Sequence, residues 1–256
     1  SFITTGFANG LLILNNFTQS LASSNGSFNP TTFTSSNTTL LGDFSVTTSS
    51  GDITITSCSF VGSNVFTSNG GGIAINNGNN FSTIHGTTTF QKNGGGDNTW
   101  TGGNTFGNVV VINNDNNYLL MANTAADDFN GSATFQQLST GILYPAHNHN
   151  NTFSGNISTS GTLTAIIFGQ GTGRMIIDGS TSQVFNGSSA LKPTIRRMTM
   201  LSTGIGELSL SVPINISLDL TLTTGKINTT VTNVLTLTDE TTTTTIGNSG
   251  SFVNGP

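Results

Sequence analysis

The sequence predicts an all-β protein, a right-handed parallel β-helix (solenoid) that ends in a Leu- and Thr-rich C-terminal β-module or cap. Three observations predict this fold. Helix-favouring Glu, Lys, Arg and Ala are scarce, apolar and polar residues alternate in short runs, and phenylalanine recurs at a nearly constant interval. Alternation with a period of two is typical of β-strands, and an interval of about 20 to 25 residues is typical of one solenoid coil.

Short alternating segments predict strands along the chain, for example at residues 52–56, 109–112 and 174–177. The longest alternating pattern covers residues 207–222, where every second residue is Leu, Ile or Val. A period of two places eight apolar side chains on one buried face: Leu208, Leu210, Val212, Ile214, Ile216, Leu218, Leu220 and Leu222.

Phenylalanine beside a small turn supplies the repeat, as in 60–62, 106–108, 129–131, 153–155 and 185–187. From Phe60 to Phe81, Phe106, Phe129 and Phe153 the intervals are 21, 25, 23 and 24 residues. Three strands of about five residues with three short turns have this length, so we predict that these rings stack in register inside a three-sided coil. We also expect the Asn-Gly pairs that follow Phe129 and Phe185 to supply the positive φ of a corner. The alternative is a β-sandwich or barrel with Asn-Gly hairpins.

The composition changes near residue 190, because sixteen of the 17 Phe lie at or before Phe185 and only Phe252 follows. We therefore divide the chain into a Phe-, Asn- and Gly-rich solenoid (1–193) and a Leu- and Thr-rich β repeat or capping module (194–256). The second part forms either the last coils, with different corner chemistry, or a cap. A cap is expected because the open end of a solenoid exposes apolar core and unpaired backbone.

Charge and cysteine content limit the partners and the compartment. Only 7% of the residues are charged, the net charge is −5, and six Lys and Arg form no basic stripe, so we expect no nucleic-acid partner. No apolar run reaches the length of about 18 residues that a membrane helix needs, so we expect no membrane span. Cys58 is the single cysteine, which excludes an intrachain disulfide and predicts a small buried strand residue.

The C-terminal segments 218–230, 234–238, 241–247 and 251–256 resemble the repeat of very large secreted surface proteins of Bacteroidetes. These are cell-surface adhesins of the kind exported by type IX secretion, including those linked to gliding motility. The resemblance covers about the last 60 residues well, whereas residues 1–195 share with the family only low-charge repeats of the Phe-Asn-Gly kind. It implies an extracellular or cell-surface location and a long filament built from many such units. It supplies no catalytic residues.

We therefore expect a structural and adhesive segment of an extracellular bacterial surface protein, and no enzyme. It would form a rigid rod that binds a glycan, a solid surface or neighbouring modules of a larger chain. Trp100, Tyr118 and Tyr144 are the candidate ligand-binding residues, because an aromatic ring stacks against the apolar face of a sugar. Because the sequence begins at Ser1, we interpret it as a processed product or a segment of a longer protein.

Several acidic residues leave other functions open. A polysaccharide-degrading enzyme built on a β-helix needs two neighbouring carboxylates, for which Asp97, Asp115 and Asp128 are the best candidates. Each of them also stands in a sequence context where turn geometry alone favours Asp. Asp115, Asp127 and Asp128 are candidate ligands for one Ca²⁺ ion, and otherwise we expect no cofactor.

Two further alternatives depend on His and Thr. His147 and His149 would share one face of a strand as half of a zinc or copper site, with His85 as the only other histidine, or would occupy a polar loop after Pro145. An ice-binding solenoid would need outward threonine ladders, and the Thr-x-Thr pairs are at 54/56, 162/164, 221/223 and 236/238. A phage tail-fibre shaft is the last alternative.

Overall fold

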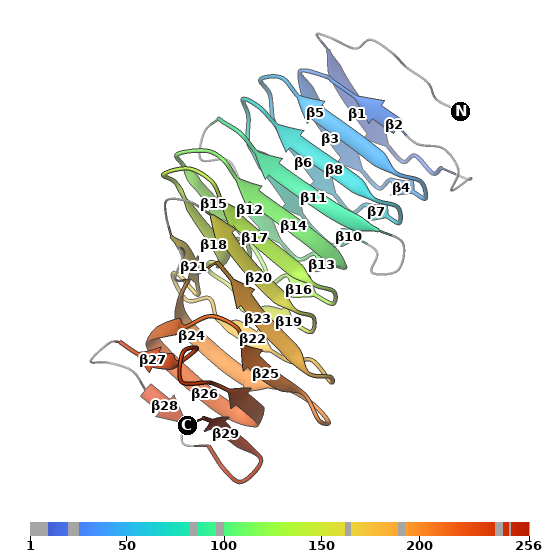
Figure 1. The fold of residues 1–256 in the computed structure, drawn as a ribbon. Coiled ribbons are helices and arrows are strands. Elements are labelled where there is room, and N and C mark those ends of the chain that lie inside the picture. Colours follow the sequence, from blue (N-terminus) through green and yellow to red (C-terminus); the bar gives the residue numbers. More distant parts are fainter. Residues whose placement is uncertain are drawn as a thin grey trace.

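In the computed structural model, the strands of successive coils lie side by side in a long stack that runs from the N-terminal to the C-terminal end (Figure 1). The structure describes residues 10–19, 26–81, 86–95, 100–161, 165–188, 193–238, 243–245 and 247–255. Within these residues every strand pair is parallel and no helix occurs. The predicted parallel β-helix is thereby confirmed and the sandwich or barrel is wrong, whereas the right-handed coiling stays a prediction.

Each coil contributes one strand to each of three columns. The strands of the first column are β1 (Leu11–Asn15), β3 (Thr32–Ser36), β6 (Ile53–Thr56), β9 (Ile73–Asn76), β12 (Trp100–Gly102), β15 (Tyr118–Leu120), β18 (Ile142–Ala146), β21 (Ile166–Phe168), the first parts of β24 (Thr194–Leu201) and β26 (Ile214–Asn228), and β27 (Leu235–Leu237).

The other two columns complete the coils. The short strands of the second column are β4 (Thr39–Leu40), β7 (Ser59–Phe60), β10 (Asn80–Phe81), β13 (Thr105–Phe106), β16 (Asp128–Phe129), β19 (Asn151–Phe153), β22 (Met175–Ile177), later parts of β24 and β26, and β28 (Thr243–Thr245). The third column holds β2 (Gly26–Phe28), β5 (Phe44–Thr48), β8 (Asn64–Ser68), β11 (Thr87–Lys92), β14 (Asn108–Asn113), β17 (Ala133–Gln137), β20 (Ile157–Gly161), β23 (Gln183–Gly187), β25 (Glu207–Leu210), the last part of β26, and β29 (Ser251–Asn254).

A phenylalanine ladder fills the interior under the second column, as the sequence predicts. Register pairs join Phe60 to Phe81, Phe106, Phe129 and Phe153 in turn. Neighbouring ring centroids are 4.7 to 5.2 Å apart and the rings are stacked. This separation is close to the spacing of about 4.8 Å between neighbouring strands, because each ring lies on the ring at the same register position in the adjacent coil.

A second set of rings, which the phenylalanine interval does not predict, enters from the third column. Phe66 and Phe90 stack on each other at 5.3 Å. Each meets a ring of the first ladder edge-on, Phe66 with Phe60 at 82° and Phe90 with Phe81 at 88°. Edge-to-face pairs are a favoured aromatic geometry, so the two sets lock the second and third columns together.

The corners differ from the prediction in their backbone conformation. Gly131 and Gly187, the glycines of the two Asn-Gly pairs, do not have positive φ. Positive φ occurs instead at Asn37, Ser57 and Asn77, in the corner between the first and second columns. Gly131 is required for a different reason, since a Cβ there would lie 2.6 Å from the backbone of the preceding coil.

The C-terminal residues continue the same stack, because β24 pairs with β21 and β22, and β25 pairs with β23. Six of the eight alternating residues of 207–222 are buried, while Leu218 and Leu222 are half-buried. The buried ones line the inside of a coil that turns corners, not one flat face. Leu218 departs from the pattern because the register between β24 and β26 shifts beside it.

Candidate functional site

Two of the predicted aromatic residues lie in one outward row of the first column. Trp100 pairs in register with Leu120, and Leu120 pairs with Tyr144. Their neighbours Leu119 and Leu143 alternate into the core, so the row itself faces outward. Trp100 and Tyr144 are therefore two strand spacings apart, about 10 Å.

Tyr118 belongs to the same face and contacts Tyr144, with ring centroids 5.8 Å apart. Tyr118 is 48% exposed, whereas Tyr144 is 8% exposed because Tyr118 covers one side and His147 packs against it at 5.3 Å. Burial raises the pKa of the Tyr144 hydroxyl, Tyr118 adds to the rise, and Arg196 opposes it. We call Trp100, Tyr118, Leu120 and Tyr144 the aromatic surface; that it binds a ligand stays a prediction.

His147 and His149 do not lie on a strand. His147 and His149 occupy the bend after β18, with His147 half-buried and His149 exposed. A ring nitrogen of His147 bonds to the Asn123 Oδ1 at 3.0 Å, and burial lowers the pKa of this imidazole. In the described part of the chain, no three His, Cys, Asp or Glu side chains gather as a metal site would require. His85 and Asp97 lie outside the described residues.

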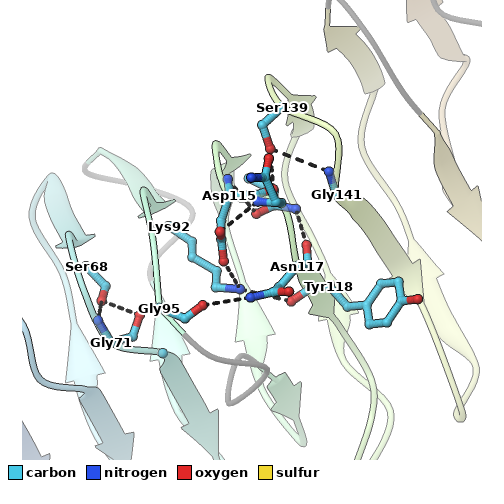
Figure 2. A network of polar contacts seen from close by, with 12 residues as sticks. Ser68, Gly71, Lys92, Gly95, Asp115, Asn117, Tyr118, Ser139 and Gly141 are labelled. Atoms are coloured by element: carbon cyan, nitrogen blue, oxygen red, sulfur yellow. Dashed lines mark hydrogen bonds and ion pairs between the residues drawn. The ribbon is translucent and has the colours of Figure 1, made fainter.

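Asp115 is engaged by a buried lysine (Figure 2). The Lys92 side chain is 0% exposed, and its Nζ lies 2.8 Å from the Asp115 Oδ2. Lys92 also donates to the backbone carbonyl of Tyr118 at 3.2 Å, while the Tyr118 ring points away from the network (Figure 2). A buried ammonium needs both a counter-charge and hydrogen-bond acceptors, so Asp115 has a structural task at this corner.

Lys92 belongs to an inward polar row at the corner from the third column to the next coil. Its register neighbours are Ser68 and Asn113, and Asn113 is followed by Gln137. The Asn113 amide donates to the Gln137 Oε1 and to the Asn117 carbonyl, both at 3.0 Å. This row was not predicted from the sequence, although Lys92 stands at the inward position two residues after Phe90.

Asp127 belongs to a second inward polar row, in the corner between the first and second columns. Asn79, Asn104, Asp127 and Asn151 each stand two residues before a ring of the phenylalanine ladder. The Asn79 amide donates to Asn104 at 2.8 Å, Asn104 donates to Asp127 at 2.8 Å, and Asn151 accepts from the Asp127 N–H at 2.7 Å. Cys58 precedes them in the row and is buried as predicted, but in the corner and not in a strand.

The environment of Asp127 opposes its ionisation. The residue is 1% exposed, and burial raises the pKa of its carboxyl from 3.8 to about 6. Hydrogen bonds from the Thr101 hydroxyl, Asn104 and the Ala122 N–H lower the pKa and reduce the effect of burial. Asp127 is thus an acid at a position where the neighbouring coils have asparagine.

The three candidate calcium ligands occupy separate places. Asp128 follows Asp127 on the other side of the strand, where it is half-buried and accepts hydrogen bonds from Thr152 at 2.6 Å and Asn130 at 3.1 Å. Asp115 lies in a different corner. The structure does not gather these carboxylates into one ligand set, so calcium binding stays a prediction.

The predicted threonine ladders are short in the described residues. Thr54 and Thr56 are half-exposed on the outer face of β6, but the next strand continues their rows with Ala74 and Asn76. The pair at 162/164 lies outside the described residues.

Comparison with known proteins finds no relative: no protein-family model, no curated protein and no solved structure matches the chain. The described residues also include no helix with the length and apolarity needed to cross a membrane. The resemblance to Bacteroidetes adhesin repeats therefore stays an expectation from the sequence.

Proposed function

We propose that this chain is a rod-like structural segment of an extracellular bacterial surface protein, and that it binds carbohydrate through the aromatic surface. The observation that supports binding is the placement of Trp100, Tyr118 and Tyr144 on one outer face of the first column. The rings of Trp100 and Tyr118 are partly exposed and offer flat apolar area to sugar rings at little cost in side-chain entropy, while the buried Tyr144 packs against Tyr118.

The solenoid supports the structural half of the proposal. Stacked rings and buried polar rows continue from coil to coil, and each coil pairs with both neighbours through parallel ladders. Such a stack is stabilised by interfaces between adjacent repeats, so a rod can be extended without a new core.

The surroundings of the acidic residues favour binding over turnover. Asp115 is paired with Lys92, and Asp128 accepts hydrogen bonds from Thr152 and Asn130. A glycosidase needs one carboxylic acid and one carboxylate that both reach the scissile bond. Asp115 and Asp128, the two described residues among the catalytic candidates, are instead engaged by neighbouring side chains.

A polysaccharide-retention assay and a glycan array test the proposal. We expect the protein to bind at least one polysaccharide, and Trp100→Ala and Tyr118→Ala to weaken this binding about tenfold or more. Val65→Ala, which removes an exposed apolar side chain from the third column, is the matched control and should bind like the wild type.

Four results would overturn all or part of the proposal. Binding to no glycan would remove its adhesive half, and release of new reducing ends from the polysaccharide would establish an enzyme. Thermal hysteresis with ice faceting that survives Trp100→Ala would establish an ice-binding face. A trimeric mass in solution together with no glycan binding would favour a fibre shaft.

A further inference from the structure

Three of the six basic residues of the chain gather beyond the C-terminal end of the aromatic surface. Arg196 and Arg197 are consecutive in β24 and neither is buried, since a register shift beside Arg197 places both outside the coil. Arg174 lies just before β22, and its side chain reaches β24, where it donates to the Met198 carbonyl at 3.0 Å. We call Arg174, Arg196 and Arg197 the arginine group.

A turn connects the arginine group with the aromatic surface. Arg197 donates to the carbonyls of Gly169 and Gly171, and Arg196 donates to the Gln170 side chain. The same turn rests on the end of β18, because the Gly169 N–H donates to the Ala146 carbonyl at 2.7 Å. Arg196 and Arg197 therefore lie two strand spacings beyond β18, the strand of Tyr144, and the charge of Arg196 opposes the rise in the pKa of Tyr144.

The positive charge of the arginine group is only partly compensated. Arg174 forms an ion pair with Asp219. In the described ranges no carboxylate lies within ion-pair distance of Arg196 or Arg197. Burial and repulsion by Arg196 and Arg174 lower the pKa of Arg197, and attraction to Asp219, its register neighbour in β26, opposes this only in part. In a chain of net charge −5, this is a concentrated positive site that an anion would stabilise.

We propose that the first column binds an acidic polysaccharide, with sugar rings on the aromatic surface and a carboxylate or sulfate group on Arg196 and Arg197. This inference rests on the proposed carbohydrate binding. The guanidinium group presents two parallel N–H donors that match the oxygens of either anion. From β12, which holds Trp100, to β24 there are four strand spacings, about 19 Å along the solenoid axis. An extended chain of several sugar units therefore reaches both parts of the surface.

Binding measurements with three soluble polysaccharides test the inference: a neutral β-glucan, a polyuronate and a sulfated galactan. We expect at least one acidic polymer to bind about tenfold more tightly than the neutral one, and raised salt to weaken only the acidic complexes. Arg196→Gln/Arg197→Gln should remove this preference and leave neutral binding unchanged. The polyuronate and sulfate arms show which anion the site takes.

Lys226→Gln, in the third-column part of β26, is the control for the single variant Arg196→Gln, because each of the two removes one positive charge. Arg196→Gln alone, which gives up the bond to Gln170, is a milder variant in case the double variant unfolds. Equal affinity for neutral and acidic polymers, or an equal loss in Lys226→Gln, would overturn this inference and leave the proposed function intact. If the protein bound none of the three polymers and no arrayed glycan, both this inference and the proposed carbohydrate binding would be overturned.

Discussion

Asn104 donates from its side-chain amide to Oδ1 of Asp127, 2.8 Å away in the next coil. Each of these residues stands two positions before a stacked phenylalanine, Phe106 or Phe129. The polar row and the ring ladder therefore specify the same register. A slip by one residue would turn the phenylalanine rings toward solvent and separate the amides from their partners, so the alternative pairings are strongly disfavoured.

Phe106→Ala tests how much the ring ladder stabilises the solenoid. Phe106 is 0% exposed and stacks on Phe81 and Phe129 at 5.2 and 5.0 Å. We expect the free energy of unfolding to fall by about 3 to 5 kcal/mol, and by less than about 1.5 kcal/mol for Phe106→Leu. Denaturant unfolding measures both. Val65→Ala is the exposed control, and an equal loss in the control would contradict the role of the ladder.

Gly155→Ala tests the tight corner between the second and third columns. A Cβ at Gly155 would lie 2.3 Å from the carbonyl oxygen of Gly131 in the preceding coil, and that oxygen is held by the backbone. We expect a loss of about 1 to 3 kcal/mol of stability from overpacking. Thermal unfolding measures the change, and Ser132→Ala at an exposed position of the same corner is the control. Unchanged stability in Gly155→Ala would show that the corner widens freely.

Period-two alternation and the phenylalanine interval suffice to predict the coil, because both depend on inward side chains that recur once per coil. The aromatic candidates Trp100 and Tyr144 were chosen by chemistry, and their common row depends on a register of the first column that the phenylalanine interval does not define. The partners of Lys92 and Asp127 were missed because each bond joins residues more than 20 positions apart. The corner at Gly131 was also misjudged, because close coil contact, not positive φ, selects glycine there.

Asp115→Asn and Lys92→Met test the buried ion pair. Asp115→Asn leaves the fully buried Lys92 ammonium without its counter-charge, for which we expect a loss of about 3 to 5 kcal/mol. The double variant Lys92→Met/Asp115→Asn removes both charges and should be more stable than Asp115→Asn alone. Denaturant unfolding of the four proteins gives the coupling energy between the two sites. Additive losses would show that the two side chains do not depend on each other.

Asp127→Asn tests the acid in the asparagine row through the pH dependence of stability. Its folded pKa of about 6 is above the ordinary value of 3.8, so the folded state holds more protons than the unfolded state between these values. The stabilising contribution of the protonated form is complete below pH 3.8 and is lost as the pH rises through about 6. The loss is at most about 3 kcal/mol, from the shift between the two pKa values.

Asparagine is an uncharged substitute that suits this position, because Asn79, Asn104 and Asn151 occupy it in neighbouring coils. Its amide oxygen can accept the two hydrogen bonds that Asn104 donates to the Asp127 Oδ1, whereas its NH2 group would face the Thr101 hydroxyl and the Ala122 N–H, which both donate to the Asp127 Oδ2. We therefore expect the unfolding free energy of Asp127→Asn, taken relative to that of the wild type, to rise between pH ~4 and pH ~7, because only the wild type buries a charge at the higher pH. Denaturant unfolding at both pH values measures this difference. Asp128→Asn, on the outer side of the strand, is the control, and a stability gain in Asp127→Asn that is independent of pH would refute the buried acid as its cause.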